Sequence, residues 1–278
     1  MLVTLAQSAI HFSDLGLSPV ALDLGFFTLK WYAISYLVML ALGWWYLRLL
    51  VIQPGAPMTR AQVDDALGYV AIGVIAGGRL GYCIFYQPSI WLQPWHVLQL
   101  WNGGMSFHGG LIGILLSLWI FARRNGIPVL RVYDYVGCAA PFGLILVRLA
   151  NFVNGELYGR PSTLPWAMIF PGSGDGIPRH PSQLYEAFFE GVLVMLLLLY
   201  LFWKTDARNR PGRLAGSGVL LYGIMRFLLE FTRQPDKGLE HLAWGLTMGQ
   251  TLCLPMIVAG AWLILRSARL HGPAPAAA

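Results

Sequence analysis

Tyr133–Gly159, YDYVGCAAPFGLILVRLANFVNGELYG, is the stretch that decides how this chain is built. Its first part is apolar and long enough to cross a membrane. Where that span would meet a loop stand Arg148, Asn151, Asn154 and Glu156. A charged side chain inside a membrane helix costs roughly 2.5–3.5 kcal/mol on insertion scales, so it needs a partner or a ligand. Because the paired N–H donors of arginine suit a phosphate, the stretch predicts a span that ends in a lipid-phosphate site.

A structural interpretation of the same stretch stays open. Arg148 can be paired with a carboxylate, and the two asparagines can cap the end of the helix. Four polar groups exceed what a helix cap needs, so we favour the ligand site.

Composition places the whole chain in the membrane class. Of its 278 residues, 56% are hydrophobic and only 12% are charged, and the mean hydropathy is +0.59. Soluble domains carry about 25% charged residues. The cysteines have no zinc-ligand spacing and the chain holds no G-x-x-x-x-G-K-[ST] motif. We therefore predict an all-α polytopic membrane protein with no metal, no cofactor and no nucleic-acid partner.

Seven apolar segments are close to the roughly 20 residues that cross a bilayer. The predicted spans cover residues 31–52, 66–86, 107–123, 133–153, 183–203, 214–233 and 243–265. Eleven of the nineteen Lys and Arg residues fall on one side, which the positive-inside rule makes cytoplasmic. The N-terminus is then outside and the C-terminus cytoplasmic. The eleven are Arg48, Arg60, Arg123, Arg124, Arg131, Lys204, Arg208, Arg210, Arg213, Arg266 and Arg269.

The outer side is predicted to hold the larger loops. Residues 1–30 and 87–106 are rich in Leu, Phe and Trp and are expected as interfacial arms. The Pro- and Gly-rich residues 154–182 predict a small periplasmic head. Residues 1–266 would form a single seven-helix membrane domain, and 267–278 a disordered tail. The first residues lack the features of a cleaved signal peptide.

His108 lies in MSFHGGLIG, Met105–Gly113, at the start of the third predicted span. Gly109 and Gly110 allow backbone to approach a ligand, and a helix N-terminus offers N–H donors to an anion. An imidazole takes up a proton near neutral pH. The alternative is an interfacial histidine beside glycines that allow close helix packing.

Tyr222, Arg226 and Glu230 follow one another at four-residue spacing, so they share one face of the sixth span. Glu230 can hold Arg226 in place for an anionic ligand, or the two can simply neutralise each other within the membrane.

Two further places are less decided. In RHPSQLYE, Arg179–Glu186, Ser182 can cap the fifth span, with Tyr185 and Glu186 facing inward on its first turn. Alternatively, this motif supports the side chains that contact the ligand. Arg79 lies in a glycine-rich stretch and is either a second ligand contact or a member of an internal ion pair.

Polar groups at the outer ends of five spans thus come to one membrane depth. Arginines and a histidine without a metal or nucleotide motif suit a phospholipid head group. Two other classes remain: a secondary transporter or channel for a small anion, and a noncatalytic lipid-binding scaffold. The absence of an internal repeat weighs against transporter folds built from repeated halves.

Four motifs, in order, carry a resemblance to the bacterial prolipoprotein diacylglyceryl transferase family that covers nearly the whole chain. They are FHGGLIG (107–113), RLANFVNGELYGRP (148–161), RHPSQLYE (179–186) and YGIMRFLLEFTR (222–233). The resemblance implies transfer of the diacylglyceryl group of phosphatidylglycerol to the lipobox cysteine thiol of a preprolipoprotein. The product is a thioether, and glycerol phosphate leaves. It also implies a bacterial inner-membrane location with the active site toward the periplasm.

The site residues expected from these motifs fall into two groups. Arg148 and Arg226 would bind the phosphate and stabilise it as it leaves, and His108 would accept the cysteine proton. The expected catalytic set is His108, Arg148, Arg226 and Tyr222. The expected substrate-binding set is Tyr32, Asn151, Asn154, Glu156, Gly159, Glu186 and Glu230. In the second set, Glu186 and Glu230 fix the cations, Gly159 shapes the turn into the head, and Tyr32 closes the pocket.

Overall fold

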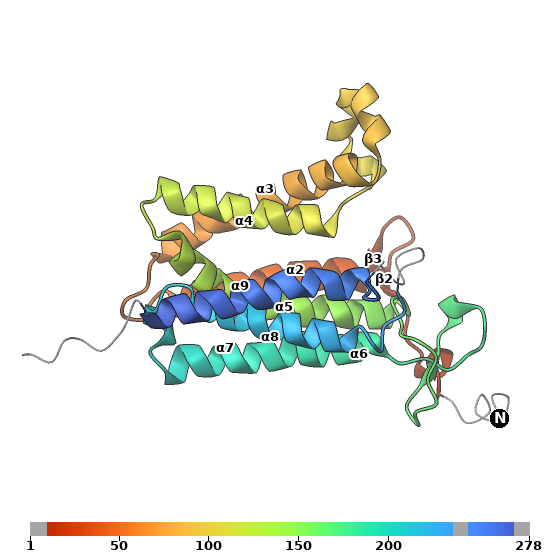
Figure 1. The fold of residues 1–278 in the computed structure, drawn as a ribbon. Coiled ribbons are helices and arrows are strands. Elements are labelled where there is room, and N and C mark those ends of the chain that lie inside the picture. The colour runs from red at the N-terminus through yellow and green to blue at the C-terminus, as the bar shows by residue number, and fades with distance from the viewer. Residues whose placement is uncertain (1–9, 236–243, 270–278) are drawn as a thin grey trace, which may run out of the picture. The chain divides into compact units, whose positions relative to one another are not determined.

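The computed structural model describes residues 10–235 and 244–269 and is mostly helical, with little sheet (Figure 1). The chain divides into two compact units. One unit combines the chain up to Trp45 with the chain from Val136 onward, and the other is Tyr46–Tyr135. Helices α2 (Trp31–Leu50) and α5 (Val129–Val153) each contribute residues to both units.

Helices stand at all seven predicted spans. Besides α2 and α5, the helices at these spans are α3 (Arg60–Phe85), α4 (Phe107–Arg124), α6 (Ser182–Glu186), α7 (Leu193–Lys204), α8 (Arg213–Leu229) and α9 (Met248–Arg269). A π-helical segment, η6 (Ala187–Val192), joins α6 to α7 into one helical stretch. Within the described residues, five stretches are long and apolar enough to cross a membrane: α2, α3, α5, α6 through α7, and α9. The protein is therefore a helical protein with several membrane-spanning segments, while the shorter α4 and α8 do not belong to that set.

The predicted and observed boundaries differ by a few residues at several helix ends, including the start of α9 at Met248. Helix α3 begins six residues before the predicted start, because Thr59 accepts a hydrogen bond from the Gln62 amide and the Gln62 side chain accepts one from the Thr59 amide. Helix α8 ends at Leu229, and the predicted final turn is instead a non-helical turn through Arg233. Helix α9 continues to Arg269, past the residue at which the tail was predicted to begin, and the rest of that tail lies outside the described residues.

In the unit Tyr46–Tyr135, α3 and α4 pack through glycines. A Cβ at Gly113 would lie 2.8 Å from the Gly73 carbonyl carbon, and one at Gly81 would lie 2.7 Å from Gly109 Cα. Gly77 also faces Gly109 and Gly113. Such backbone-to-backbone contact is possible only without side chains at these positions. Gly109 therefore serves helix packing, as the structural interpretation of this motif predicted.

The other unit is a bundle in which α8 packs between α7 and α9 (Figure 1). Gly216 and Gly260 bring α8 and α9 together, since a Cβ on either would lie within 3 Å of the opposite helix. Helix α2 reaches α5 through Gly43, which faces Ala139. A Cβ at Gly191 of η6 would lie 2.5 Å from Ile145 Cγ1, so η6 is pressed against α5.

Short strands occur only in the predicted first arm and head, among the residues that the structure describes. Strand β1 (Ile10–His11) pairs in parallel with β4 (Met168–Ile169), and β2 (Val20–Asp23) pairs antiparallel with β3 (Thr28–Lys30). The ring of Phe12 lies 5.5 Å from that of Phe152 and 5.3 Å from that of Phe170. Aromatic packing therefore fastens part of the first arm to the end of α5 and to the head.

The predicted second arm consists of three 3-10 turns, η2 (Pro88–Leu92), η3 (Pro94–Leu98) and η4 (Leu100–Asn102). Trp95 and Trp101 are exposed there. Amphipathic indole rings of this kind suit a membrane interface, which is the role predicted for the arm.

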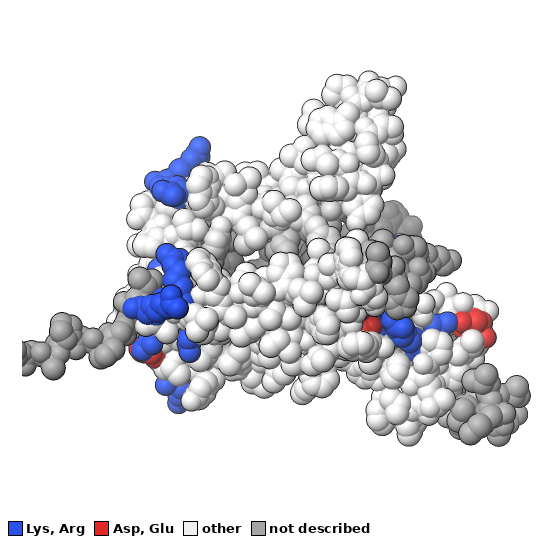
Figure 2. All heavy atoms as spheres, in the orientation of Figure 1, with Lys and Arg blue, Asp and Glu red and all other residues white. Residues whose placement is uncertain are grey.

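On the face of the bundle unit that Figure 2 shows, charged side chains lie at the ends of the helices. In the bundle unit, Figure 2 shows Lys and Arg gathered at the end where α7 terminates, while acidic and basic groups mix at the opposite end. The side chains of the helix middles on the face shown are uncharged. This pattern is typical of helices that cross a hydrocarbon layer.

Substituting alanine for Gly113 tests the packing of α3 on α4. A methyl group would meet the backbone of α3, so we expect Gly113→Ala to destabilise the protein by about 3 kcal/mol. Gly110→Ala is the matched control on the same helix, because its methyl would lie 3.7 Å from the Val74 carbonyl oxygen, an ordinary contact. The control should be neutral or slightly stabilising, by about 0.5 kcal/mol. Thermal unfolding in detergent measures both, and equal effects would contradict the packing argument.

Candidate active site

Six charged side chains meet in the bundle unit. They are Arg148 on α5, Glu186 on α6, Glu190 on η6, Arg226 on α8, and Glu230 and Arg233 in the turn that follows α8. The three carboxylates are almost fully buried, with exposed fractions of 1%, 0% and 5% for Glu186, Glu190 and Glu230. We call this set the arginine–glutamate cluster. Buried charges of this kind persist only when they are paired.

Two carboxylates of the cluster form close pairs. Glu186 joins two arginines, since its Oε2 lies 2.7 Å from Arg148 Nε and its Oε1 lies 2.5 Å from Arg233 Nη1. Glu230 Oε2 lies 2.7 Å from Arg226 Nη1 and 3.4 Å from Arg233 Nε. The cluster thus ties α5, α6 and the C-terminal end of α8 together. The pairings of Arg148 and of Arg226 are those that the structural interpretations of both motifs predicted.

Glu190 and Arg233 were not among the predicted site residues. The available signal was a second glutamate four residues after Glu186 in an otherwise apolar span, since an intramembrane carboxylate marks a functional site by default. Its oxygens lie 3.7 Å from Arg148 Nη2 and 3.8 Å from Arg226 Nε. Glu190 therefore faces both predicted phosphate ligands.

The loop after α5 holds the asparagines against one carboxylate. Asn151 Nδ2 donates to Glu156 Oε1 at 2.8 Å, and Asn154 Nδ2 donates to the same oxygen at 3.2 Å. The Gln183 side chain donates to the Glu156 carbonyl oxygen at 2.6 Å. The Oδ1 atoms of both asparagines are buried without a hydrogen bond from the described part of the chain. Each of these two amide oxygens can accept hydrogen bonds, and hydroxyl groups of a polar ligand are donors of the matching kind.

Ser182 does not cap the fifth span, contrary to the prediction. Its hydroxyl donates to the Leu157 carbonyl oxygen at 3.0 Å, and the residue before the helix is Pro181. A proline in that position already restricts the backbone, and the serine is used instead to fasten the loop after α5. Leu157 needs this support because its φ of 56° is a left-handed conformation that L-residues rarely adopt.

Gly159 lies where three segments meet. Its amide donates to the His180 carbonyl oxygen at 2.8 Å, and it forms a bridge with Arg233 in the turn after α8. A Cβ at this position would lie 2.7 Å from His180 Cβ, so only glycine fits.

Two titratable groups of the head have shifted pKa values. Hydrogen bonds from the Arg179 side chain and from the Ile177 amide lower the pKa of Asp175 to about 2. Burial lowers the pKa of His180, whose Nδ1 lies 3.4 Å from the Tyr185 hydroxyl. The lowered pKa keeps Asp175 ionised through the neutral range, so its ion pair with Arg179 persists there.

The other predicted site residues lie on helices. Tyr222 stands on α8, one turn before Arg226. Tyr32 lies in the first turn of α2, with its ring 5.2 Å from that of Tyr36. His108 is exposed at the second position of α4, next to the N-cap Ser106, whose hydroxyl accepts from the Gly109 amide. His108 belongs to the unit Tyr46–Tyr135, and the cluster belongs to the other unit.

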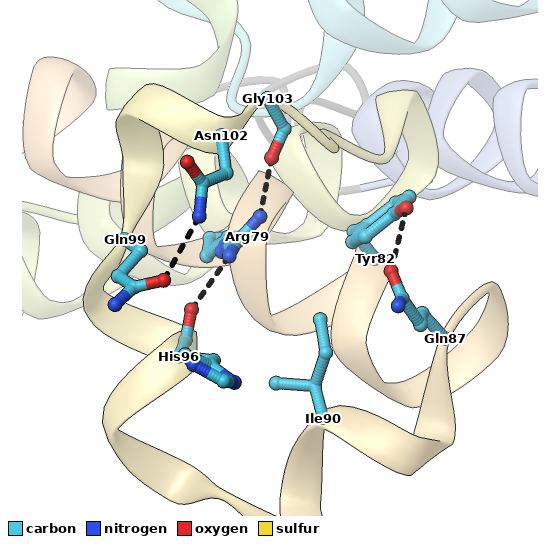
Figure 3. Close-up of a pocket in the computed structure, with 8 residues that line it drawn as sticks. All are labelled: Arg79, Tyr82, Gln87, Ile90, His96, Gln99, Asn102 and Gly103. Atoms are coloured by element: carbon cyan, nitrogen blue, oxygen red, sulfur yellow. Dashed lines mark hydrogen bonds between the residues drawn. The ribbon is translucent and has the colours of Figure 1, made fainter.

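Arg79 has a structural role. It is 5% exposed, its Nε donates to the Val97 carbonyl oxygen at 2.9 Å, and its Nη2 donates to that of His96 at 2.7 Å. Its Nη1 donates to the carbonyl oxygens of Gly103 and Gly104. The guanidinium therefore holds the arm 87–106 onto α3 (Figure 3). A cavity of about 190 Å³ lies beside it, but the arginine is occupied by backbone carbonyl groups.

Removing Glu186 tests the energetic role of the cluster. Glu186→Ala leaves Arg148 and Arg233 without their closest partner in a buried setting, so we expect a loss of about 3–5 kcal/mol of stability. The control is Asp206→Ala, because the exposed pair of Asp206 with Arg210 should contribute less than about 1 kcal/mol. Thermal unfolding in detergent compares the two variants. A Glu186→Ala variant as stable as the control would rule out the cluster as a structural tie.

Comparison with known proteins identifies the family. The sequence profile described as prolipoprotein diacylglyceryl transferase matches residues 19–266. The phosphatidylglycerol–prolipoprotein diacylglyceryl transferase of Zymomonas mobilis is 52% identical over 94% of this chain and 94% of its own length. Those of Erythrobacter litoralis and Rhodospirillum rubrum are 48% and 49% identical, over 92% and 88% of this chain and 91% and 90% of their own lengths. The chain belongs to the prolipoprotein diacylglyceryl transferase family.

Proposed function

We propose that this protein transfers the sn-1,2-diacylglyceryl group of phosphatidylglycerol to the lipobox cysteine thiol of preprolipoproteins. The observation that carries this proposal is the match, along almost the whole chain, to relatives named for that reaction. A buried cluster with two arginines at the ends of membrane helices supports it, because the reaction releases a phosphate. The anion-transporter and scaffold alternatives have no such support.

The reaction needs charge stabilisation and a proton acceptor. The cysteine sulfur forms a bond to the glycerol carbon, the bond from that carbon to the phosphate oxygen breaks, and glycerol phosphate leaves with one more negative charge than the phosphodiester had. Arg148 and Arg226 bind the phosphate and stabilise this developing charge. Their pairing with Glu186 and Glu230 fixes the two guanidinium groups at the ends of α5 and α8.

The groups around the arginines orient the lipid head. Asn151 and Asn154 present their buried Oδ1 atoms to the glycerol hydroxyl groups, and Glu156 holds both amides in that orientation. Tyr222 lies one helical turn from Arg226 and contacts the head group from α8. Gly159 keeps the loop close to the head, and Tyr32 closes the pocket from the end of the first arm.

His108 is the proposed proton acceptor. A thiolate, not a thiol, is the nucleophile, and an imidazole at the start of a helix can take the thiol proton directly or through water. Its exposure at the second position of α4 leaves it accessible to a peptide substrate.

The membrane arrangement completes the proposal. All seven helical stretches span the bacterial inner membrane as a single domain, the N-terminus is outside, and the basic ends of the helices face the cytoplasm. The active site then faces the periplasm, where preprolipoprotein signal peptides and the outer leaflet meet. Membrane lipids contact the arm 87–106 and the described part of the first arm, residues 10–30.

The arginine variants test the reaction itself. With phosphatidylglycerol and a lipobox peptide in detergent, wild type should release glycerol phosphate while the peptide gains the mass of a diacylglyceryl group. Arg148→Ala and Arg226→Ala should each lower kcat/KM by about 100-fold or more, because the leaving phosphate loses a positioned cation. Near wild-type rates in a folded Arg226→Ala protein would remove its phosphate role. Lipid binding without any release by wild type would point to a scaffold.

His108→Gln tests the proton acceptor. Glutamine keeps the size and polarity of the side chain but cannot take a proton at neutral pH, so kcat should fall by about 100-fold or more. Raising the pH increases the thiolate fraction of the peptide, so the defect should shrink at high pH. Full turnover of His108→Gln at pH 7 would show that another group accepts the proton.

A further inference from the structure

Glu190 is the carboxylate of the arginine–glutamate cluster that the proposed roles leave unused. It is 0% exposed, and neither of its oxygens accepts a hydrogen bond within the described residues. Arg148 Nη2 and Arg226 Nε lie 3.7 and 3.8 Å away. Glu186 and Glu230 are 2.7 Å from those same arginines, so Glu190 is held more loosely than either.

The backbone, rather than the carboxylate, keeps Glu190 in this place. Residues Ala187–Val192 form a π-helical turn, a feature that is frequently found at functional sites. The next residue, Gly191, lies so close to α5 that a Cβ there would be 3.2 Å from the Ile145 backbone nitrogen. The glycine therefore brings the π turn against α5, the helix that carries Arg148.

The charges of the cluster balance without a ligand. Three arginines face three glutamates, so the cluster is neutral if all six are ionised. A phosphodiester adds one negative charge, and a phosphate monoester at alkaline pH adds two. Of the three carboxylates, only Glu190 is within 4 Å of both Arg148 and Arg226, the groups to which a phosphate would bind.

We propose that Glu190 is the built-in counter-ion of the phosphate subsite. It neutralises Arg148 and Arg226 when no lipid is bound, and it repels the phosphate that binds them. Since repulsion grows with ligand charge, Glu190 weakens the binding of the doubly charged glycerol phosphate product more than that of phosphatidylglycerol. Its function is then to promote product release. This inference rests on the proposed transfer reaction.

A purely structural role predicts different behaviour. A glutamate that only supports the arginines should, when removed, weaken the binding of substrate and product alike. A repelling counter-ion should, when neutralised, strengthen both. Coulomb energy is proportional to ligand charge. If neutralising Glu190 raises the affinity for a monoanion by some factor, it should therefore raise the affinity for a dianion by about the square of that factor.

The experiment compares wild type, Glu190→Gln and Glu190→Asp, purified in detergent at pH 8. The affinity for phosphatidylglycerol comes from equilibrium binding, and that for glycerol phosphate from inhibition of the peptide reaction. For Glu190→Gln we expect phosphatidylglycerol to bind about threefold tighter and glycerol phosphate about tenfold tighter, with a lower kcat. Glu190→Asp withdraws the carboxylate by one methylene, so its affinities for both ligands should lie between those of wild type and of Glu190→Gln. Asp206→Asn removes a carboxylate at the basic end of the bundle and should change neither affinity.

The outcomes separate this inference from the proposed function. Unchanged or weaker binding of both ligands to a folded Glu190→Gln protein would overturn the counter-ion role. An equal gain in affinity for phosphatidylglycerol and for glycerol phosphate would overturn it as well. If Glu190→Gln does not fold, the same ordering must appear in Glu190→Asp, and its absence there would overturn the role. A wild-type protein that neither binds phosphatidylglycerol nor releases glycerol phosphate would instead refute the transfer reaction.

Discussion

One buried carboxylate, shared by two arginines, ties the helices of the bundle unit together at one end. Glu186 contacts Arg148 on α5 and Arg233 beyond α8, and its exposed fraction is 1%. Bringing these charges out of water costs several kcal/mol for each ion, and only close pairing offsets that cost. The ends of α5, α6 and α8 must therefore stay within reach of one another for the bundle to be stable.

The loop after α5, which carries the asparagines and Glu156, is held in place by α6, the helix that carries Glu186. Ser182 and Gln183 stand next to Glu186 on α6 and donate to the Leu157 and Glu156 carbonyl oxygens. Glu156 in turn orients two asparagine side chains. The short helix α6 thus positions a cation on one side and an amide-bearing loop on the other. A helix placed by buried ion pairs is rigid enough to hold such groups at fixed distances.

Much of the fold could be predicted from the sequence because a membrane helix is identified by the apolar composition of its own segment. The stretch from Trp31 to Leu47 carries no charged residue and is close to the length that crosses a bilayer, so it needs no tertiary information to be identified as a span. Spacing also placed Tyr222, Arg226 and Glu230 on one face, since an α-helix repeats every 3.6 residues. The start of α3 was missed because a polar capping box lies outside the apolar run that defines a span.

The partners that charged groups find on other helices could not be predicted in the same way. The pairing of Arg148 with Glu186 joins two helices, and no local pattern fixes which helices touch. The π turn that places Glu190 is likewise a response to packing, because it lies where Gly191 meets α5. For Arg79 the sequence left a ligand contact and an internal ion pair open, and the guanidinium instead donates to carbonyl groups that only the folded arm brings near.

Charge balance in the cluster also governs how its variants must be interpreted. Replacing Arg148 removes a phosphate ligand, but it also leaves Glu186 with one arginine instead of two and Glu190 with only the more distant Arg226. An uncompensated buried charge is strongly destabilising, so lost activity alone does not assign a catalytic role to any of these residues. Activity and stability have to be measured on the same preparation. Neutralising Glu190 relieves one charge while the close pairs of Glu186 and Glu230 stay intact, which makes it the position where electrostatics and folding are most cleanly separated.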